Sequence, residues 1–289
     1  MINKYIKMEL KGNKKFTKNT VKKGKSIQLK LNKFEKRKLM ENKENTKVCM
    51  IYKICEESLN SYIRLFGSDF AKSNKSKCAI IICGKEYGMK DKICFEEYEK
   101  YGINKNVDIL EVILKGEAIE EISDMFCGCE NLIKVDFVSF NTKNIVDMSS
   151  MFCGWSNLTK VDLSIFITEN VTNMSYMFSG CESLIKINLL SFNSDNVVDM
   201  SNMFSGCESL TEADLSSFNT QNVIDMSNMF SYCYRLIKVN LSLFNTQNIT
   251  NMSWMFYGCQ CLIEINRKNC SKIINDFKSI KSKLFIIEI

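Results

Sequence analysis

The dipeptide Met-Phe recurs along this chain at one fixed interval, and that interval constrains the fold more than any other feature. Its six copies begin at residues 125, 151, 177, 203, 229 and 255, so every interval is 26 residues. A fixed period between about 20 and 50 residues is typical of proteins in which similar coils stack on one another. We therefore expect six stacked coils, each formed by one 26-residue segment.

Large apolar residues keep the same register in each coil. Leu132, Val135 and Phe137 have equivalents in the later copies, and this Leu-x-x-Val-x-Leu spacing predicts a strand with one buried face. Further columns begin at Phe140, at Ile145 and at Met148. Because one coil cannot bury its own apolar face, neighbouring coils have to share a continuous core.

Polar residues and glycine also recur at fixed positions. Asp147 and Ser149, with their equivalents, precede Met-Phe, where their side chains can accept hydrogen bonds from the first amides of a short helical turn. Gly128 and its equivalents suit a turn that needs a positive φ. The Asn column at 144, 170, 196, 222 and 248 is expected to hydrogen-bond the turn of the next coil, and a second Asn ladder at 141, 193, 219 and 245 is interrupted by Ile167.

The coils are expected to span residues 121–266, and an open stack needs a cap at its first coil. Three apolar runs precede the coils, at 62–67, 79–87 and 108–114, and the second has a hairpin turn near Gly84. These runs predict that 48–120 forms a β-rich N-terminal cap.

The two ends of the chain differ in charge and in pattern. Residues 1–47 hold 16 basic and 4 acidic side chains, so they are predicted to be a basic, disordered tail. Residues 267–289 are predicted to be a C-terminal cap, with a helix over 271–280 and a strand over 284–287.

The composition excludes several kinds of chemistry. The chain has no His, so mechanisms that depend on imidazole are excluded, and no phosphate-binding loop or nucleophile motif is visible. One Cys per coil recurs at 129, 181, 207, 233 and 259, without the close Cys pairs of zinc sites, and this indicates buried thiols. We expect a protein that is not an enzyme and has no metal, no cofactor and no small-molecule substrate.

The sequence lacks the apolar segments of exported or membrane proteins. No run of about 18 apolar residues occurs, and the first residues have no apolar core of a signal peptide. The protein is therefore expected to be cytoplasmic. A nuclear location and a cell surface reached by non-standard export are the alternatives.

Two surfaces of the coils are candidates for partner binding. The predicted strand face carries outward charges, which are Lys134, Asp136, Lys160, Asp162, Lys186, Glu212, Asp214 and Lys238. The alternative is a solvated ladder in which Lys on one coil meets an acid on the next. The last two coils gather Tyr232, Tyr234, Trp254 and Tyr257, which are typical interface residues or else pack on the C-terminal cap.

The repeat resembles a known family. The runs at 170–184 and 214–220 closely resemble BspA-like leucine-rich repeats, and the resemblance covers about 121–266. It implies a right-handed solenoid, with one strand and one short helical turn in each coil, and an interaction or adhesion role.

We therefore expect a non-enzymatic module that binds a protein partner through the strand face or the aromatic C-terminal coils. One alternative is a surface, adhesin-like structural protein. Another is binding of nucleic acid or an anionic membrane surface by the basic tail, which is otherwise a merely solubilising segment.

Overall fold

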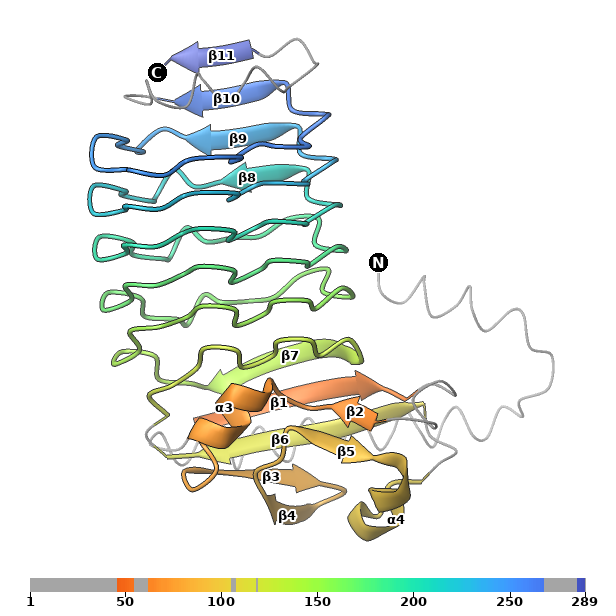
Figure 1. The fold of residues 1–289 in the computed structure, drawn as a ribbon. Coiled ribbons are helices and arrows are strands. Elements are labelled where there is room, and N and C mark those ends of the chain that lie inside the picture. Colours follow the sequence, from red (N-terminus) through yellow and green to blue (C-terminus); the bar gives the residue numbers. More distant parts are fainter. Residues whose placement is uncertain (1–45, 55–61, 105–107, 118, 268–284, 289) are drawn as a thin grey trace, which may run out of the picture. The chain divides into compact units, whose positions relative to one another are not determined.

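A computed structural model of the chain describes residues 46–54, 62–104, 108–117, 119–267 and 285–288. Figure 1 shows the regular elements of this part. In chain order they are β1 (Thr46–Lys53), β2 (Tyr62–Arg64), α3 (Ser68–Ser73), β3 (Cys78–Ile82), β4 (Lys85–Gly88), β5 (Lys92–Cys94), η2 (Phe95–Glu97), α4 (Tyr98–Tyr101), β6 (Ile109–Gly116), β7 (Leu132–Ser139), β8 (Glu212–Asp214), β9 (Lys238–Leu241), β10 (Glu264–Arg267) and β11 (Phe285–Glu288). None of the helices in this part has the length and hydrophobicity that crossing a bilayer requires.

The segment before the coils folds mainly as an antiparallel sheet. Its strand order is β4-β3-β6-β1-β7, and each neighbouring pair is antiparallel. Strands β2 and β5 form a separate pair. The predicted strands contain β2 and overlap β3, β4 and β6, whereas α3, η2 and α4 were not expected from the sequence.

Strand β1 is the element that the sequence-based domain boundary missed. The predicted tail included Thr46 and Lys47, but both residues belong to β1. This strand lies between β6 and β7, with Met50 opposite Val135 of the first coil. A strand beside a Lys-rich run shows little local signal, because its stability comes from partners that are distant in sequence. The strand of the first coil is thus the last strand of the cap sheet.

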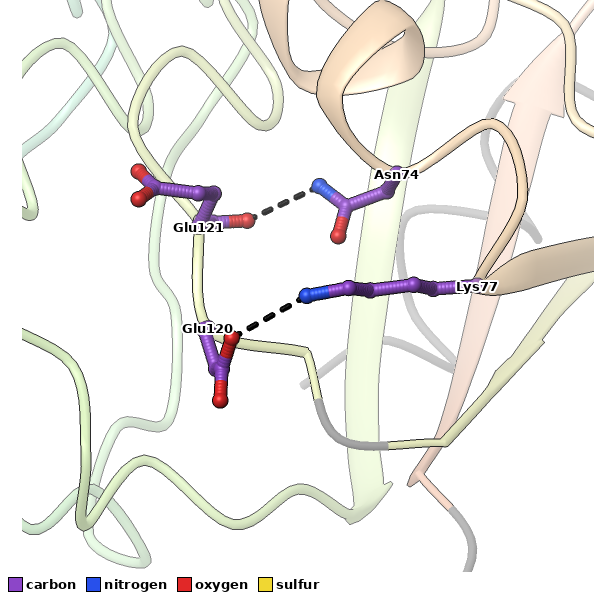
Figure 2. Close-up of polar contacts among 4 residues, drawn as sticks. All are labelled: Asn74, Lys77, Glu120 and Glu121. Carbon is purple, nitrogen blue, oxygen red and sulfur yellow. Dashed lines mark hydrogen bonds and ion pairs between the residues drawn. The ribbon is translucent and has the colours of Figure 1, made fainter.

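Polar contacts join the cap to the segment that enters the first coil (Figure 2). Asn74, which follows α3 and is buried, donates from Nδ2 to the carbonyl oxygen of Glu121 at 2.9 Å. Nearby, Lys77 Nζ lies 3.1 Å from the Glu120 carboxylate. The Asn74 bond satisfies a buried amide, so it fixes the cap against coil one more firmly than the exposed ion pair does.

Gly67 also lies at this junction, where two backbone segments approach closely. Its amide donates to the carbonyl oxygen of Met125 at 3.2 Å. A Cβ atom at this position would lie 1.9 Å from the carbonyl oxygen of Asp124. Only glycine therefore permits this contact between the cap and the first coil.

Successive 26-residue coils lie directly over one another, as Figure 1 shows from β7 to β10. In the middle of the stack, the amide of Phe178 donates to the carbonyl oxygen of Met203, and that of Phe204 to Met229, each at 2.9 Å. The Phe rings of neighbouring coils stack with centroid distances of 5.9, 5.3, 5.5, 5.4 and 5.5 Å along the series Phe126, Phe152, Phe178, Phe204, Phe230 and Phe256. The cap and the coils share one cluster of buried apolar side chains.

The short helical turn that was expected in each coil is not helical. The residue before each Met-Phe has a positive φ between 54° and 64°. The residue four positions later also has a positive φ, and it is glycine in every coil except coil five, which has Tyr232. Two left-handed residues within five positions cannot belong to an α-helix. The segment instead forms successive tight turns, such as the bond from the Cys153 amide to the Ser150 carbonyl oxygen at 3.0 Å. The Asp147 carboxylate accepts from the Ser149 amide at 2.7 Å and stabilises a local turn, not a helix start.

Regular strands are also less frequent than expected. Among the described coil residues, a strand forms at the Leu-x-x-Val-x-Leu pattern only as β7, β8, β9 and β10. Coils two and three carry the pattern but have no strand there. Val135, Val161 and Ile187 are half-buried in this region, whereas Val239 and Ile265 are fully buried. A second line of parallel bridges joins Asp147, Asn173, Asp199, Asp225 and Asn251 on another side of each coil.

A column of buried hydroxyls, which the sequence analysis did not identify, connects the coils. Thr142, Thr168, Ser194, Thr220 and Thr246 are at most 2% exposed. Thr220 Oγ1 donates to the carbonyl oxygen of Asn245 at 3.0 Å and accepts from the Asn245 amide at 2.8 Å. One hydroxyl thus pairs both main-chain groups of a residue in the next coil.

The two asparagine columns differ from their predicted roles. Asn170, Asn196, Asn222 and Asn248 do bond a neighbouring coil, but it is the preceding one: Asn196 Nδ2 donates to the carbonyl oxygen of Glu169 at 2.7 Å. The Oδ1 atoms of Asn141, Asn193, Asn219 and Asn245 accept from the amide two residues later, so they close local turns. An amide oxygen two residues before a free N–H readily accepts from it. Asn219 also reaches the preceding coil, because its Nδ2 donates to Asp195 Oδ1 at 2.8 Å.

The C-terminal strand adds to the coils. Strands β8, β9, β10 and β11 form a parallel sheet in which β11 pairs with β10. The predicted strand over 284–287 overlaps β11. The predicted helix over 271–280, and the predicted tail up to residue 45, lie outside the described residues.

Candidate functional site

The strand face carries the predicted charges outward. Lys134, Asp136, Lys160, Asp162, Lys186, Glu212 and Asp214 are exposed, and Lys238 is half-buried. Lys134 and Lys160 form no ion pair with any described residue. Lys134 and Asp136 lie on β7, opposite Ile51 and Cys49 of β1, so the cap borders this end of the face.

Farther along the same face, the charges neutralise one another between coils. Lys186 Nζ lies 2.7 Å from Glu212 Oε2, and Lys238 Nζ lies 2.6 Å from Glu264 Oε1. The hydrogen bond from Lys186 lowers the pKa of the Glu212 carboxyl, and the bond to Glu264 raises the pKa of the Lys238 ammonium. Such solvent-exposed pairs contribute little to stability, but they leave fewer free charges for a partner.

Asp162 has a local partner of a different kind. Its Oδ1 accepts from the Ser164 amide at 3.0 Å, and the hydrogen bonds from the Ser164 side chain and backbone lower the pKa of the Asp162 carboxyl. This carboxylate therefore closes a turn. Several charges of the strand face thus have partners of their own. Among the described residues of this face, Asn266 on β10 is the exception, because its Oδ1 atom is buried and has no hydrogen-bond partner there.

Four aromatic side chains of coils five and six form one exposed cluster. The exposed fractions are 44% for Tyr232, 36% for Tyr234, 55% for Trp254 and 38% for Tyr257. Tyr232 contacts Tyr234 and Tyr257 at centroid distances of 6.1 and 5.3 Å, and Trp254 contacts Tyr257 at 4.7 Å. The interplanar angles of 66°, 88° and 74° are edge-to-face arrangements, which aromatic pairs favour. The structure therefore brings together all four aromatic residues predicted from the sequence.

Tyr232 stands where most coils have glycine. Gly128, Gly154, Gly180, Gly206 and Gly258 share this position and a positive φ, and Tyr232 has a φ of 59°. A non-glycine residue in this region costs roughly 1–2 kcal/mol. Its ring packs over Gly258 in the next coil. Strained residues persist where surrounding contacts hold them and are common at binding sites.

The Cys column is buried, as the sequence predicted. Cys181 donates from Sγ to the carbonyl oxygen of Phe152 at 3.2 Å, and the thiols of the next three coils repeat this contact. Burial raises the pKa of the Cys259 thiol to about 12. Trp155 replaces the Cys in coil two and donates from its indole nitrogen to the carbonyl oxygen of Leu132. In the described part of the chain, no group of three or more Cys, Asp or Glu side chains is arranged to hold a metal ion.

An open depression of about 540 Å³ lies beside β3 and β6 in the cap. Lys77 and Lys115 line it, but each already has a carboxylate partner, Glu120 at 3.1 Å and Glu86 at 2.7 Å. Burial raises the pKa of the Cys78 thiol beside them to about 11, so it is protonated at neutral pH. This depression offers neither free positive charge nor a reactive thiol.

The stacked coils define a repeat protein. A family model described as "Mycoplasma protein of unknown function, DUF285" matches residues 95–189 and 184–283. The chain belongs to this family, and the match supports, at the level of the family, the resemblance to BspA-like repeats. No curated protein matches the chain, and no solved structure matches it.

Proposed function

We propose that this chain is a non-enzymatic interaction module whose coils form a leucine-rich-repeat-type solenoid. In this proposal the aromatic cluster of Tyr232, Tyr234, Trp254 and Tyr257 binds a protein partner. The observation that carries the proposal is the contact of these four exposed rings with one another across two neighbouring coils. Tyr and Trp are the residues most enriched among the dominant contacts of protein interfaces.

At three of its positions the cluster has the only aromatic residue among the six coils, and at the position of Trp254 only Tyr176 is also aromatic. The preceding coil has Gly206, Glu208, Asn228 and Ser231 at the equivalent positions, so small or polar residues are enough to build the turn. The aromatic residues therefore add exposed apolar area that the stack does not need. Tyr232 even takes on a strained backbone conformation, which a glycine would avoid. A binding role accounts for both features.

The strand face is the less favoured surface for the same function. Its charges are divided between both signs, and Lys186 and Lys238 have acidic partners on the next coil. A partner would have to break these pairs to use the charges. The remaining unpaired lysines, Lys134 and Lys160, would mainly raise the association rate and orient the partner, and they would add less to the affinity.

A repeat-consensus variant tests the proposal while keeping the fold. It takes each ring back to the residue found one coil earlier, and the four changes are Tyr232→Gly, Tyr234→Glu, Trp254→Asn and Tyr257→Ser. Immobilised wild-type chain and variant are exposed to the same lysate of the source cells, and captured proteins are compared by mass spectrometry. We expect a partner that binds the wild type and is lost with the variant, although both unfold at similar temperatures.

Two control variants make the outcome specific. Tyr176→Asn removes an exposed aromatic residue of coil three, which lies outside the cluster of coils five and six. This change should leave capture of the partner unchanged. Replacing Lys134, Lys160 and Lys186 together by Ala tests the strand face. If the consensus variant captures the same proteins as the wild type, the aromatic cluster is not the binding surface. Loss of capture with the triple Lys variant alone would transfer the function to the strand face.

Trp254 provides a direct readout of contact. The chain has two Trp residues, and Trp155 is buried whereas Trp254 is 55% exposed. A partner that covers the cluster should shift the emission of Trp254 to shorter wavelength. Emission that does not change at saturating partner would show that the partner binds elsewhere.

A further inference from the structure

Two cysteines outside the buried Cys column lie side by side on coils one and two. Cys127 and Cys153 occupy the same position in neighbouring coils, where coils three to five have Ser179, Ser205 and Ser231. Backbone hydrogen bonds of 2.8 and 2.7 Å, from Phe126 to Met151 and from Gly128 to Cys153, flank the pair. These bonds keep the two side chains in register.

The two thiols contact each other and remain accessible. A side-chain hydrogen bond joins Cys127 to Cys153, and a second one joins Cys127 to the Asp124 carboxylate. Both cysteines are half-buried, whereas Cys129, two residues away, is fully buried. The pair therefore differs from the structural thiols of the stack because each of its members can meet a small solute.

The hydrogen bond assigns different roles to the two sulfur atoms. The bond from Cys127 lowers the pKa of the Cys153 thiol, because a donated proton stabilises the Cys153 thiolate. The same bond raises the pKa of Cys127, and burial and the nearby Asp124 carboxylate raise it further. This direction favours Cys153 as the nucleophile of the pair, with Cys127 keeping its proton beside it.

We propose that Cys127 and Cys153 form a redox modification site, at which a hydroperoxide such as hydrogen peroxide converts the two thiols into one disulfide between coils. This site is independent of the partner-binding function proposed above. It depends on the two sulfur atoms and not on the aromatic rings of coils five and six.

The reaction proceeds in two balanced steps. The Cys153 thiolate attacks one oxygen of hydrogen peroxide; an S–O bond forms, the O–O bond breaks, and the leaving hydroxide takes up a proton to become water. The Cys127 sulfur then attacks the sulfenic sulfur of Cys153; the S–S bond forms, the S–O bond breaks, and the leaving hydroxide takes the Cys127 proton as a second water. Two thiols lose two electrons in total, and one peroxide is reduced to two waters.

Bond formation requires only a small movement. Neighbouring chains in register are about 4.8 Å apart, and a disulfide needs Cβ atoms about 3.5–4.5 Å apart. The two turns therefore have to approach by roughly 1 Å. Because this movement stores strain, the disulfide is expected to be reduced readily by a dithiol, as labile disulfides are.

Peptide mapping of the whole chain tests the proposal. Reduced protein is treated with hydrogen peroxide, its remaining thiols are alkylated, and it is digested with trypsin. Cleavage after lysine places Cys127 in peptide 116–134 and Cys153 in peptide 144–160. We expect these two peptides to become cross-linked and to separate again after treatment with dithiothreitol.

Cys127→Ser and Cys153→Ser serve as matched variants, because coils three to five carry Ser at this position. Each should abolish the cross-link. A cross-link that persists in Cys127→Ser would involve Cys129, which shares the peptide, and would overturn the assignment. So would the absence of any cross-link in the wild type at peroxide doses that oxidise Cys153 to the sulfinic acid.

A sulfenic-acid probe separates the roles of the two sulfur atoms. In Cys127→Ser, the hydroxyl still donates to Cys153, so dimedone should label Cys153. In Cys153→Ser, labelling of Cys127 should be lower, because burial and the Asp124 carboxylate still raise the pKa of the Cys127 thiol. Equal labelling of the two variants would refute the assigned nucleophile. Cys127→Ala, which removes the donor, should label Cys153 more slowly than Cys127→Ser does.

Discussion

Thr220→Val is the most informative single perturbation of the stack. Thr220 is completely buried, and its hydroxyl pairs both the amide and the carbonyl of Asn245 in the next coil. Val has nearly the same shape but removes both hydrogen bonds. Each polar group that loses its partner in this way costs about 1–3 kcal/mol.

Two lost bonds and one gained methyl group set the magnitude. Because Asn245 is half-buried, values near the lower end apply to each of its two groups. The added apolar surface of Val returns less than about 1 kcal/mol. We therefore expect the free energy of unfolding to fall by about 1–2 kcal/mol, which corresponds to roughly 2–8 °C in melting temperature for a chain of this size.

Thr220→Ser is the matched control, because Ser194 occupies the same column. It keeps the hydroxyl and loses one methyl group, for a cost of about 1 kcal/mol. Urea and thermal unfolding followed by circular dichroism compare the two variants. If Thr220→Val proves as stable as Thr220→Ser or more so, the hydroxyl bridge does not stabilise the coils and the reasoning is wrong.

Three further predictions follow from other contacts. Gly67→Ala should lower the melting temperature, at a cost of about 1–3 kcal/mol or more from overpacking, whereas Gly88→Ala, with open space around it, should have little effect. Phe204→Ala interrupts the ring stack and should cost about 3–5 kcal/mol in a urea titration; a loss below about 1 kcal/mol would contradict close packing. The hydrogen bond from Lys90 lowers the pKa of the Glu97 carboxyl, so its stabilising contribution is present at neutral pH and is lost as pH falls through the folded-state value. Glu97→Gln should therefore destabilise the chain more at neutral pH than in acid, and melting curves recorded over a falling pH series should converge with those of the wild type.

The 26-residue period predicted which side chains share the interior. Met177, Leu184 and Val197 are fully buried, and so are their equivalents one coil later. A burial pattern that repeats without insertions needs no knowledge of backbone conformation, because each coil imposes its register on the next. The same period grouped the four exposed rings of coils five and six, since residues 26 positions apart have to be neighbours.

The backbone conformation of the turns was not predictable in the same way. Ser150, Tyr176 and Trp254 share a left-handed conformation although their side chains have nothing in common. The position in the coil, and not the residue type, therefore determines this conformation. Taken singly, the residues found there favour other regions of φ and ψ. Short polar residues before Met-Phe suit a helix start as well as a local turn, so the sequence pattern alone does not distinguish the two.

Contacts between distant segments were missed for a related reason. Thr220 is a polar residue in a run that resembles a surface loop, and only the next coil shows that its hydroxyl is buried. The thiol pair was also overlooked, because Cys127 and Cys153 continue as Ser in later coils and so do not form a complete column. Exceptions to a repeat carry information that an average over its copies hides.

The antiparallel pairing of β1 with β7 has a consequence for assembly. Arrays of parallel coils can grow by end-to-end joining, because the exposed edge of one copy is a template for the first coil of another. Here the first coil already has a neighbour of opposite direction, with Val48 opposite Phe137. A second copy that arrives with its coils parallel finds this edge occupied, so head-to-tail polymerisation through the first coil is blocked by the chain itself.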